Sequence, residues 1–153
     1  MRISAKADYA VRAMIELAAE SRVERPVKGD QIAEAQAIPL RFLENILAEL
    51  RHAGLVQSRR GTEGGYWLSR PADDVTLAEI IRAVEGPLAT VRGAPPDELV
   101  LEGDARPLQE VWIALRANIR EILESVTLAD VASGDLPEPV HAIAEHPDVW
   151  QSR

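Results

Sequence analysis

Apolar residues recur at helical spacing along most of this chain, and the first such run predicts a helix from Ser4 to about Glu20. Ser4 supplies a capping hydroxyl at the start of this helix. Its apolar stripe consists of Ala7, Ala10, Val11, Met14, Leu17 and Ala18. Proline and glycine within positions 25–29 then interrupt the pattern, and a short second helix is expected from Asp30 to Gln36.

A third helix is predicted from Leu40 to Ala53, with Pro39 suited to its first turn and Gly54 suited to the left-handed position after its end. The residues that share one stripe and are expected to face the core are Leu40, Leu43, Leu47 and Leu50. The residues left pointing outward near the start of the helix are Arg41, Phe42, Glu44 and Asn45.

A basic, glycine-rich loop follows this helical pair and lies between two short apolar runs, 55–56 and 66–68. The loop reads Arg59-Arg60-Gly61-Thr62-Glu63-Gly64-Gly65. Two helices followed by such a hairpin predict a winged helix-turn-helix, a mostly α fold with a small β wing. Because side chains alternate along a strand, one of Tyr66 and Trp67 must face inward, and Trp67 is the one expected there.

Thr76 and Glu79 form a capping box for a fourth helix, which ends at 86–87. Residues 87–106 have no periodicity and are expected to form a loop. Pro107 then opens a long fifth helix. Its apolar positions are Leu108, Val111, Trp112, Leu115, Ile119, Ile122, Leu123 and Val126.

Thr127 and Asp130 make a second capping box, for a short helix that stops at Gly134. The tail after it contains little to bury except Val140, Ile143 and Trp150. The predicted organisation is a DNA-binding domain at 1–86, a loop at 87–106, a dimerisation helix region at 107–133 and a tail at 134–153.

The net charge of −8 is unevenly distributed. The first 70 residues contain 11 basic and 9 acidic residues, and the remainder contains 6 basic and 16 acidic residues. The acidic second half repels phosphate, so DNA is expected on one face of the first half only. The N-terminus shows no uninterrupted apolar run, so no signal peptide or membrane span is expected and the protein should be cytoplasmic.

The chain contains no cysteine, which excludes disulfides, thiolate metal sites and cysteine nucleophiles. His52, His141 and His146 have no metal-ligand spacing. No nucleophile lies beside a base, and neither paired carboxylates in an apolar setting nor a phosphate-binding loop is present, so an enzyme is not expected.

Four segments in order, at 7–14, 38–44, 51–58 and 60–66, resemble the Rrf2-type transcriptional regulators, a group of bacterial repressors that includes iron–sulphur, nitric-oxide and cysteine-metabolism regulators. The helix with Trp112 and the segment 127–130 also look like the dimerisation region of that family. The resemblance covers about residues 1–132. It implies a winged-helix homodimer in which the long helix of each subunit crosses its partner.

Many members of that family hold an iron–sulphur cluster, with three cysteines in the loop before the long helix and a further ligand near its start. This chain has no cysteine, and Gln109 stands about where the further ligand is expected. An amide oxygen is a poor ligand for such a cluster. We therefore expect no metal and no cofactor.

The residues expected to bind DNA are Lys28, Pro39, Arg41, Phe42, Glu44, Asn45, Arg51, Arg59, Arg60, Gly61, Gly64 and Gly65. Arg41 suits guanine, Asn45 suits adenine and Glu44 can accept a hydrogen bond from cytosine. Phe42 either contacts thymine methyl groups or covers the edge of the core. The arginines of the loop are expected to contact phosphate or a groove.

The residues expected to form the dimer interface are Leu108, Val111, Trp112, Leu115, Ile119 and Ile122. Asp8 and Arg12 are expected to be a surface ion pair, and together with Gln109 they mark a possible region for an unidentified effector.

The sequence thus predicts a sequence-specific DNA-binding regulator, a repressor that acts as a homodimer on an inverted-repeat operator in double-stranded DNA. The alternative is a winged-helix module that binds protein. Steep weakening of DNA binding by salt would distinguish the first from the second.

Overall fold

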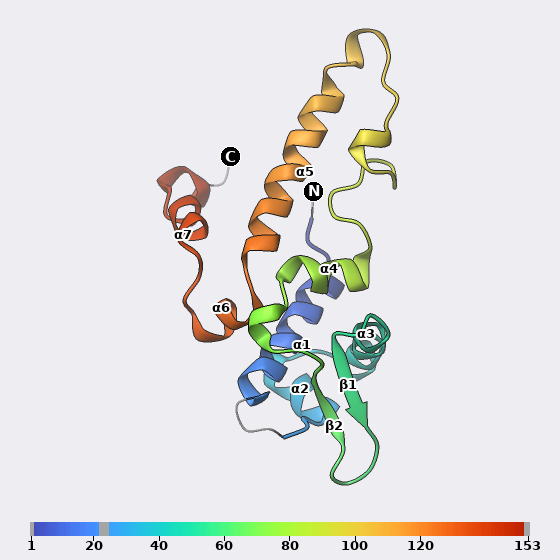
Figure 1. Ribbon diagram of the computed structural model, residues 1–153, viewed down its shortest axis with the longest axis vertical. Helices are drawn as coiled ribbons and strands as arrows, with labels where there is room; N and C mark the ends of the chain where they lie inside the picture. Colours follow the sequence, from blue (N-terminus) through green and yellow to red (C-terminus); the bar gives the residue numbers. More distant parts are fainter. Residues whose placement is uncertain (1, 22–24, 152–153) are drawn as a thin grey trace.

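A computed structural model describes residues 2–21 and 25–151, and it confirms the predicted winged helix-turn-helix with a long helix after it (Figure 1). The α-helices are α1 (Ala5–Ser21), α2 (Gly29–Gln36), α3 (Leu40–His52), α4 (Leu77–Glu85), α5 (Leu108–Ser125), α6 (Leu128–Ser133) and α7 (Glu138–Ala144). The strands are β1 (Val56–Arg59) and β2 (Gly65–Leu68). Short 3-10 turns are η1 (Ala72–Asp74), η2 (Pro96–Glu98), η3 (Gly103–Ala105) and η4 (Pro147–Trp150).

Helix α1 lies at the centre of the core and packs against α2, α3, α4, α6 and β2. Ser4 accepts a hydrogen bond from the Ala7 N–H at 3.0 Å, as expected of a cap. The predicted stripe of α1 is buried apart from Val11, which is partly buried. Ala10 and Ala13 are fully buried, and such small side chains allow neighbouring helices to approach α1 closely.

Helix α3 buries Leu43, Leu47 and Leu50 as predicted, but the prediction for Leu40 was wrong because 43% of it is exposed. Leu40 is the first residue of the helix, after the N-terminal cap at Pro39. The buried stripe instead includes Ile46 in the second turn. The first residue of α3 therefore lies at the edge of the core, and the buried stripe begins at Leu43.

Strands β1 and β2 are antiparallel, with Val56 opposite Leu68 and Arg59 opposite Gly65. Val27 extends this sheet, because its N–H and C=O each form a 2.8 Å hydrogen bond with Tyr66. Tyr66 and Leu68 pack against the core. The expectation that Trp67 faces inward was wrong: pairing Leu68 with the buried Val56 places Leu68 and Tyr66 on the core side.

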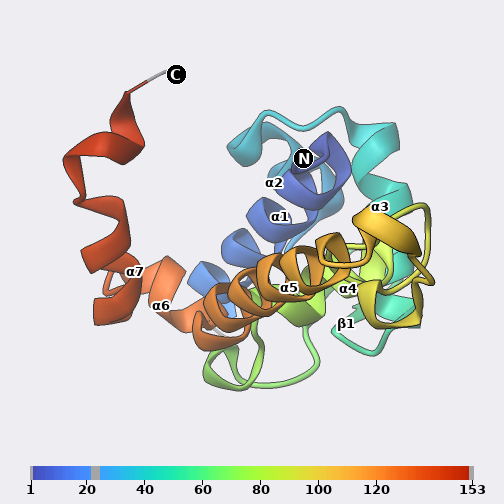
Figure 2. The ribbon, with the colours of Figure 1, turned by 90° about the horizontal axis from the view of Figure 1, so that it is seen from above.

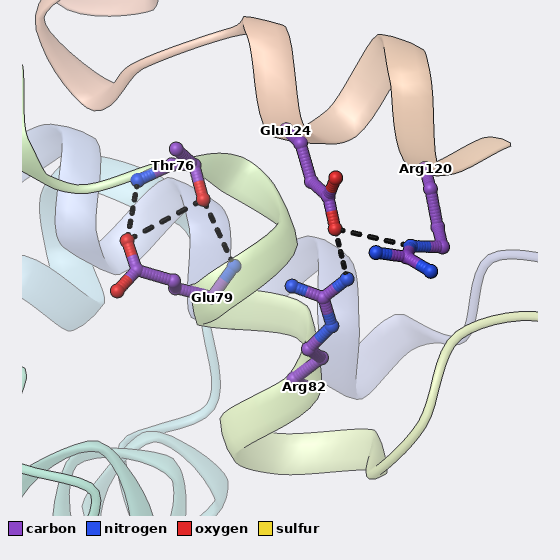
Figure 3. Close-up of polar contacts among 5 residues, drawn as sticks. All are labelled: Thr76, Glu79, Arg82, Arg120 and Glu124. Carbon is purple, nitrogen blue, oxygen red and sulfur yellow. Dashed lines mark hydrogen bonds and ion pairs between the residues drawn. The ribbon is translucent and has the colours of Figure 1, made fainter. Parts of the chain in front are cut away.

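Both predicted capping boxes are present, at Thr76 with Glu79 and at Thr127 with Asp130 (Figure 3 shows the first). The two caps are also joined to each other. The Leu77 N–H donates to the Val126 carbonyl at 3.0 Å, and the Leu128 N–H donates to the Val75 carbonyl at 2.8 Å. Since Leu128 is fully buried, this bridge fastens the end of α5 and all of α6 to the winged domain.

Glu79 also forms a 2.8 Å ion pair with Arg70, which follows β2. Burial raises the pKa of Glu79, but the Thr76 N–H and the Arg70 guanidinium outweigh burial and leave that pKa below its ordinary value of 4.5. The ionised carboxylate therefore stabilises the fold above that ordinary value, and this stabilisation is lost as the pH falls through the lowered pKa.

The segment 87–106 contains η2 and η3, and it buries Leu88, Pro96 and Leu99. The tail forms α7 and η4, which its composition did not predict. Ile143 and Trp150 are 53% and 78% exposed, so the tail forms helical turns without burying its large side chains. Among the described residues, no helix combines the length and the apolar character needed to cross a membrane.

Replacing Thr127 with Ala should lower the free energy of unfolding by about 1 kcal/mol, because the Asp130 N–H loses its side-chain cap. Denaturant unfolding measures this change. Thr62, exposed in the wing turn, provides the matched control, and Thr62→Ala should change stability by less than about 0.5 kcal/mol. Equal effects of the two substitutions would contradict the role assigned to the cap.

Candidate nucleic-acid interface

Helix α3 and the β1–β2 wing lie at one end of the molecule, and the wing loop points away from the body (Figure 1). The segment 87–106 lies at the opposite end. Arg51, in the last turn of α3, donates a 3.1 Å hydrogen bond to Ser58 Oγ on β1. This contact ties the helix to the wing, so the two elements present one continuous surface.

The outer face of α3 contains the exposed side chains of Arg41, Glu44 and Asn45. In the described part of the chain, none of them has a hydrogen bond or ion pair, so their donors and acceptors remain available. Arg41 offers paired donors, Asn45 offers a donor and an acceptor, and Glu44 offers an acceptor. A base edge in the major groove presents the complementary groups.

Phe42 is 42% exposed, and its ring meets Tyr9 of α1 edge to face, with 5.7 Å between centroids. Such contacts favour one ring orientation. Phe42 therefore covers the edge of the core on one side while the rest of its ring faces solvent, beside the exposed face of α3.

The basic residues of the wing differ in what they contact. Lys28 Nζ donates to the Gly61 carbonyl at 2.7 Å, and Arg59 donates to the Glu63 carbonyl at 3.1 Å. Both therefore brace the wing loop. Arg60 is exposed and has no such bond to any described residue, so its guanidinium is available for phosphate.

Gly64 and Gly65 are required by the wing itself. A Cβ on Gly64 would lie 2.1 Å from the Arg59 carbonyl oxygen. A Cβ on Gly65, whose φ is +148°, would lie 2.7 Å from the Val27 carbonyl oxygen. Both glycines are buried, whereas Gly61 is exposed at the tip. Of the three glycines, Gly61 is thus the one placed to approach a ligand.

Asp8 and Arg12 form the expected ion pair, at 3.1 Å, with about half of the Asp8 side chain exposed. Arg12 also donates to the side chain of Gln36 at 3.4 Å and to its backbone carbonyl. Gln36 in turn donates to Glu16 at 2.8 Å. Arg12 therefore holds the end of α2 to α1, which helps to set the angle of the turn into α3. Sequence spacing gave no signal for these contacts of Gln36, because they join separate helices.

The start of α5 lies at the top of Figure 1, above α1, and none of the described contacts of Asp8 or Arg12 is with Gln109. Its amide donates to the carbonyls of Pro96 at 3.2 Å and Leu99 at 2.8 Å. The sequence could not predict these partners, which lie in a segment without periodicity. Gln109 thus ties the segment 87–106 to α5.

An iron–sulphur cluster does not fit the residues at this place. The chain has no thiolate to offer, and the amide donors of Gln109 are engaged by backbone carbonyls. No group of three His, Asp or Glu side chains among the described residues is arranged to hold a metal ion. The amide oxygen of Gln109 is a poor ligand for a cluster that is held by thiolates.

The six residues predicted for dimerisation lie along α5, which has no buried residue in the single chain. Val111 is 55% exposed, Leu108 is 41% exposed and Leu115 is 38% exposed. Trp112, Ile119 and Ile122 are partly buried. A helix with this many exposed apolar side chains is typical of an interface.

Comparison with known proteins gives a consistent result. Residues 3–134 match the Rrf2 family, described as iron-dependent transcriptional regulators. A Mycobacterium tuberculosis protein named as an HTH-type transcriptional regulator is 50% identical over 145 residues, which cover 95% of this chain and 89% of the relative. The HTH-type transcriptional regulator CymR of Bacillus subtilis is 40% identical over 133 residues, covering 87% and 91%.

Solved structures agree with the fold. The structure of CymR, the global cysteine regulator of B. subtilis, has a TM-score of 0.74 and 39% identity, and covers 87% of this chain and 97% of that one. The IscR structure from T. potens has a TM-score of 0.68 and 33% identity, and covers 100% and 93%.

Proposed function

Because this chain belongs to the Rrf2 family of DNA-binding transcriptional regulators, we propose that it acts as a homodimeric repressor on an inverted-repeat operator. One observation supports sequence-specific binding most directly. On the exposed face of α3, beside a projecting wing, the side chains of Arg41, Glu44 and Asn45 form no hydrogen bond with any described residue. In winged helix-turn-helix proteins this helix enters the major groove.

In this proposal the residues of the interface divide into three classes. Arg41, Glu44 and Asn45 contact base edges, which carry sequence information. Arg60 and the tip of the wing contact phosphate, which carries none. Lys28, Arg59, Gly64 and Gly65 act through the shape of the wing, because their contacts are with the chain itself.

Residues 1–86 bind DNA, residues 107–133 form the dimer and residues 87–106 link the two parts. The exposed apolar side chains of α5 support this division, because a second copy of the same helix would cover them. A two-fold dimer presents two α3 helices to the same side of the duplex, which requires an inverted-repeat operator.

The regulator works without an iron–sulphur cluster, in contrast to the description of its family as iron-dependent. The lack of cysteine and the engagement of Gln109 by backbone carbonyls support this part of the proposal. Its signal is then a small molecule or a partner rather than the state of a cluster.

Replacing Arg41, Glu44 or Asn45 with Ala should change which operator sequences are preferred. The effect should be about 1 to 3 kcal/mol at a base that loses a good contact. Replacing Arg60 with Ala should instead weaken binding to all sequences by a similar factor. Binding to a randomised operator library, measured for each variant, separates the two outcomes.

Unchanged sequence preferences in all three α3 variants would contradict the assignment of that face. Failure of the parent protein to bind DNA or heparin even at low salt would favour a protein-binding winged module instead, since phosphate contacts make affinity fall steeply with salt.

Replacing Leu115 with Glu should dissociate the dimer and abolish operator binding, because a carboxylate would enter the apolar contact between two α5 helices. Sedimentation measures the first effect and gel retardation the second. Ala117 is exposed about 200° around the helix from Leu115, so Ala117→Glu is the matched control and should remain dimeric. A parent protein that is monomeric at micromolar concentration would refute the dimer.

After anaerobic reconstitution with iron and sulphide, the purified protein should be colourless and contain no stoichiometric iron, because no thiolate is present to bind a cluster. Operator affinity should be equal in air and under anaerobic conditions. Visible absorbance accompanied by stoichiometric iron would overturn this prediction.

A further inference from the structure

The second half of the chain is acidic, yet three of its six basic residues gather at one open pocket of about 480 Å³. Arg82 comes from the last turn of α4, and Arg116 and Arg120 come from successive turns of α5. Gly86, Pro87 and Leu88 complete the lining. The pocket thus lies where the winged domain meets the long helix, and it is separate from the DNA-binding face at α3.

The three guanidinium groups are only partly satisfied by the protein. Arg82 and Arg120 both donate to one oxygen of Glu124, the bond from Arg120 Nε measuring 3.2 Å (Figure 3). Arg116 donates to Asp97 of η2 at 2.7 Å. Arg116 Nε is buried and has no hydrogen-bond partner among the described residues. A buried donor without a partner is costly, and an acceptor that reaches Nε after a shift of the Arg116 side chain would remove that cost.

Charge favours an anion at this pocket. Within residues 2–21 and 25–151, the three arginines are paired with two carboxylates, Glu124 and Asp97, which leaves one positive charge without an ion-pair partner. Hydrogen bonds from Arg82 and Arg120 hold the pKa of Glu124 below its ordinary value, so Glu124 is counted as one of the two negative charges. Each guanidinium offers five N–H groups in a planar fork, more than two carboxylate contacts use.

We propose that the pocket lined by Arg82, Arg116 and Arg120 binds a small molecule through a phosphate group. Guanidinium forks match the geometry of phosphate oxygens and bind them through paired, charge-assisted hydrogen bonds. The volume is within the range of pockets that hold small organic ligands, so it accommodates a phosphorylated metabolite as well as free phosphate.

Binding here provides a route to regulation, a consequence that rests on the proposed function. Helix α4 packs against α1, α3 and α5, so it contacts both the recognition helix and the helix assigned to the dimer. A phosphate bridging Arg82 to Arg116 and Arg120 favours one placement of α4 against α5. A ligand that binds one placement better changes operator affinity, and operator changes ligand affinity by the same factor.

The pocket is tested on the protein without DNA, with inorganic phosphate as the probe. Titration at constant ionic strength, followed by the NMR signals of the arginine Nε–H groups, should show saturable binding with the Arg116 signal among those that shift. This measurement needs no variant. An Arg116 signal that does not respond while the protein is exposed to saturating phosphate would overturn the proposal.

Variants locate the site. Arg116→Gln and Arg120→Gln should each weaken phosphate binding by about tenfold or more, because each removes a charge-assisted contact. Arg106 is exposed in the same acidic half and does not line the pocket, so Arg106→Gln is the matched control and should bind as the parent does. Thermal unfolding identifies any variant that has lost its fold. If Arg106→Gln weakened phosphate binding equally, the affinity would depend on net charge alone, and the proposed site would be refuted.

Operator binding with and without inorganic phosphate, at fixed ionic strength, tests the regulatory step. A change in operator affinity that disappears in Arg116→Gln supports it, and an unchanged affinity at saturating phosphate refutes it. Phosphate binding by a protein that binds no DNA would leave the pocket established and refute the proposed function, so the two failures are distinguishable.

Discussion

The bridge between the caps of α4 and α6 is the constraint on which the arrangement of this molecule depends. Thr76 and Thr127 each cap a helix, and the backbone on either side of them is joined by hydrogen bonds between Leu77 and Val126 and between Leu128 and Val75. The fully buried Leu128 anchors this join in the core. Helix α5 therefore leaves the winged domain from a fixed point, and it lies across the domain when seen from above (Figure 2). If two α5 helices form the dimer, the same point sets the separation of the two α3 helices.

Local information was sufficient for much of this fold. Both capping boxes, the stripe of α1 and the left-handed glycine at position 54 depend on neighbours in sequence, and each was predicted correctly. The errors at Leu40 and Trp67 have a different origin, because helical or strand periodicity does not say where the core ends or which strand face it covers. The contacts of Gln36 and Gln109 join separate elements and leave no periodic pattern. Helix α7 buries no residue and so lacks the apolar stripe by which helices are recognised.

The candidate interface also shows why a count of basic residues overstates the number of side chains without a partner in the protein. Lys28 and Arg59 are bonded to wing carbonyls, and Arg51 is bonded to Ser58. These three residues shape the surface, whereas the guanidinium groups of Arg41 and Arg60 have no partner in the part of the chain that the structure describes. Exposure alone did not separate the two groups, because all four arginines are exposed. The two groups differ in the hydrogen-bond partners of each side chain, and these partners are known only from the three-dimensional structure.

The segment 87–106 is held to α5 by hydrogen bonds from side chains of that helix. Gln109 binds two of its carbonyls, and Arg116 binds Asp97 within it. The Arg116–Asp97 pair does respond to charge, since it competes with any anion that reaches Arg116. The family is described as iron-dependent, but the contacts at the junction of α4 and α5 in this chain are ion pairs between arginine and carboxylate side chains.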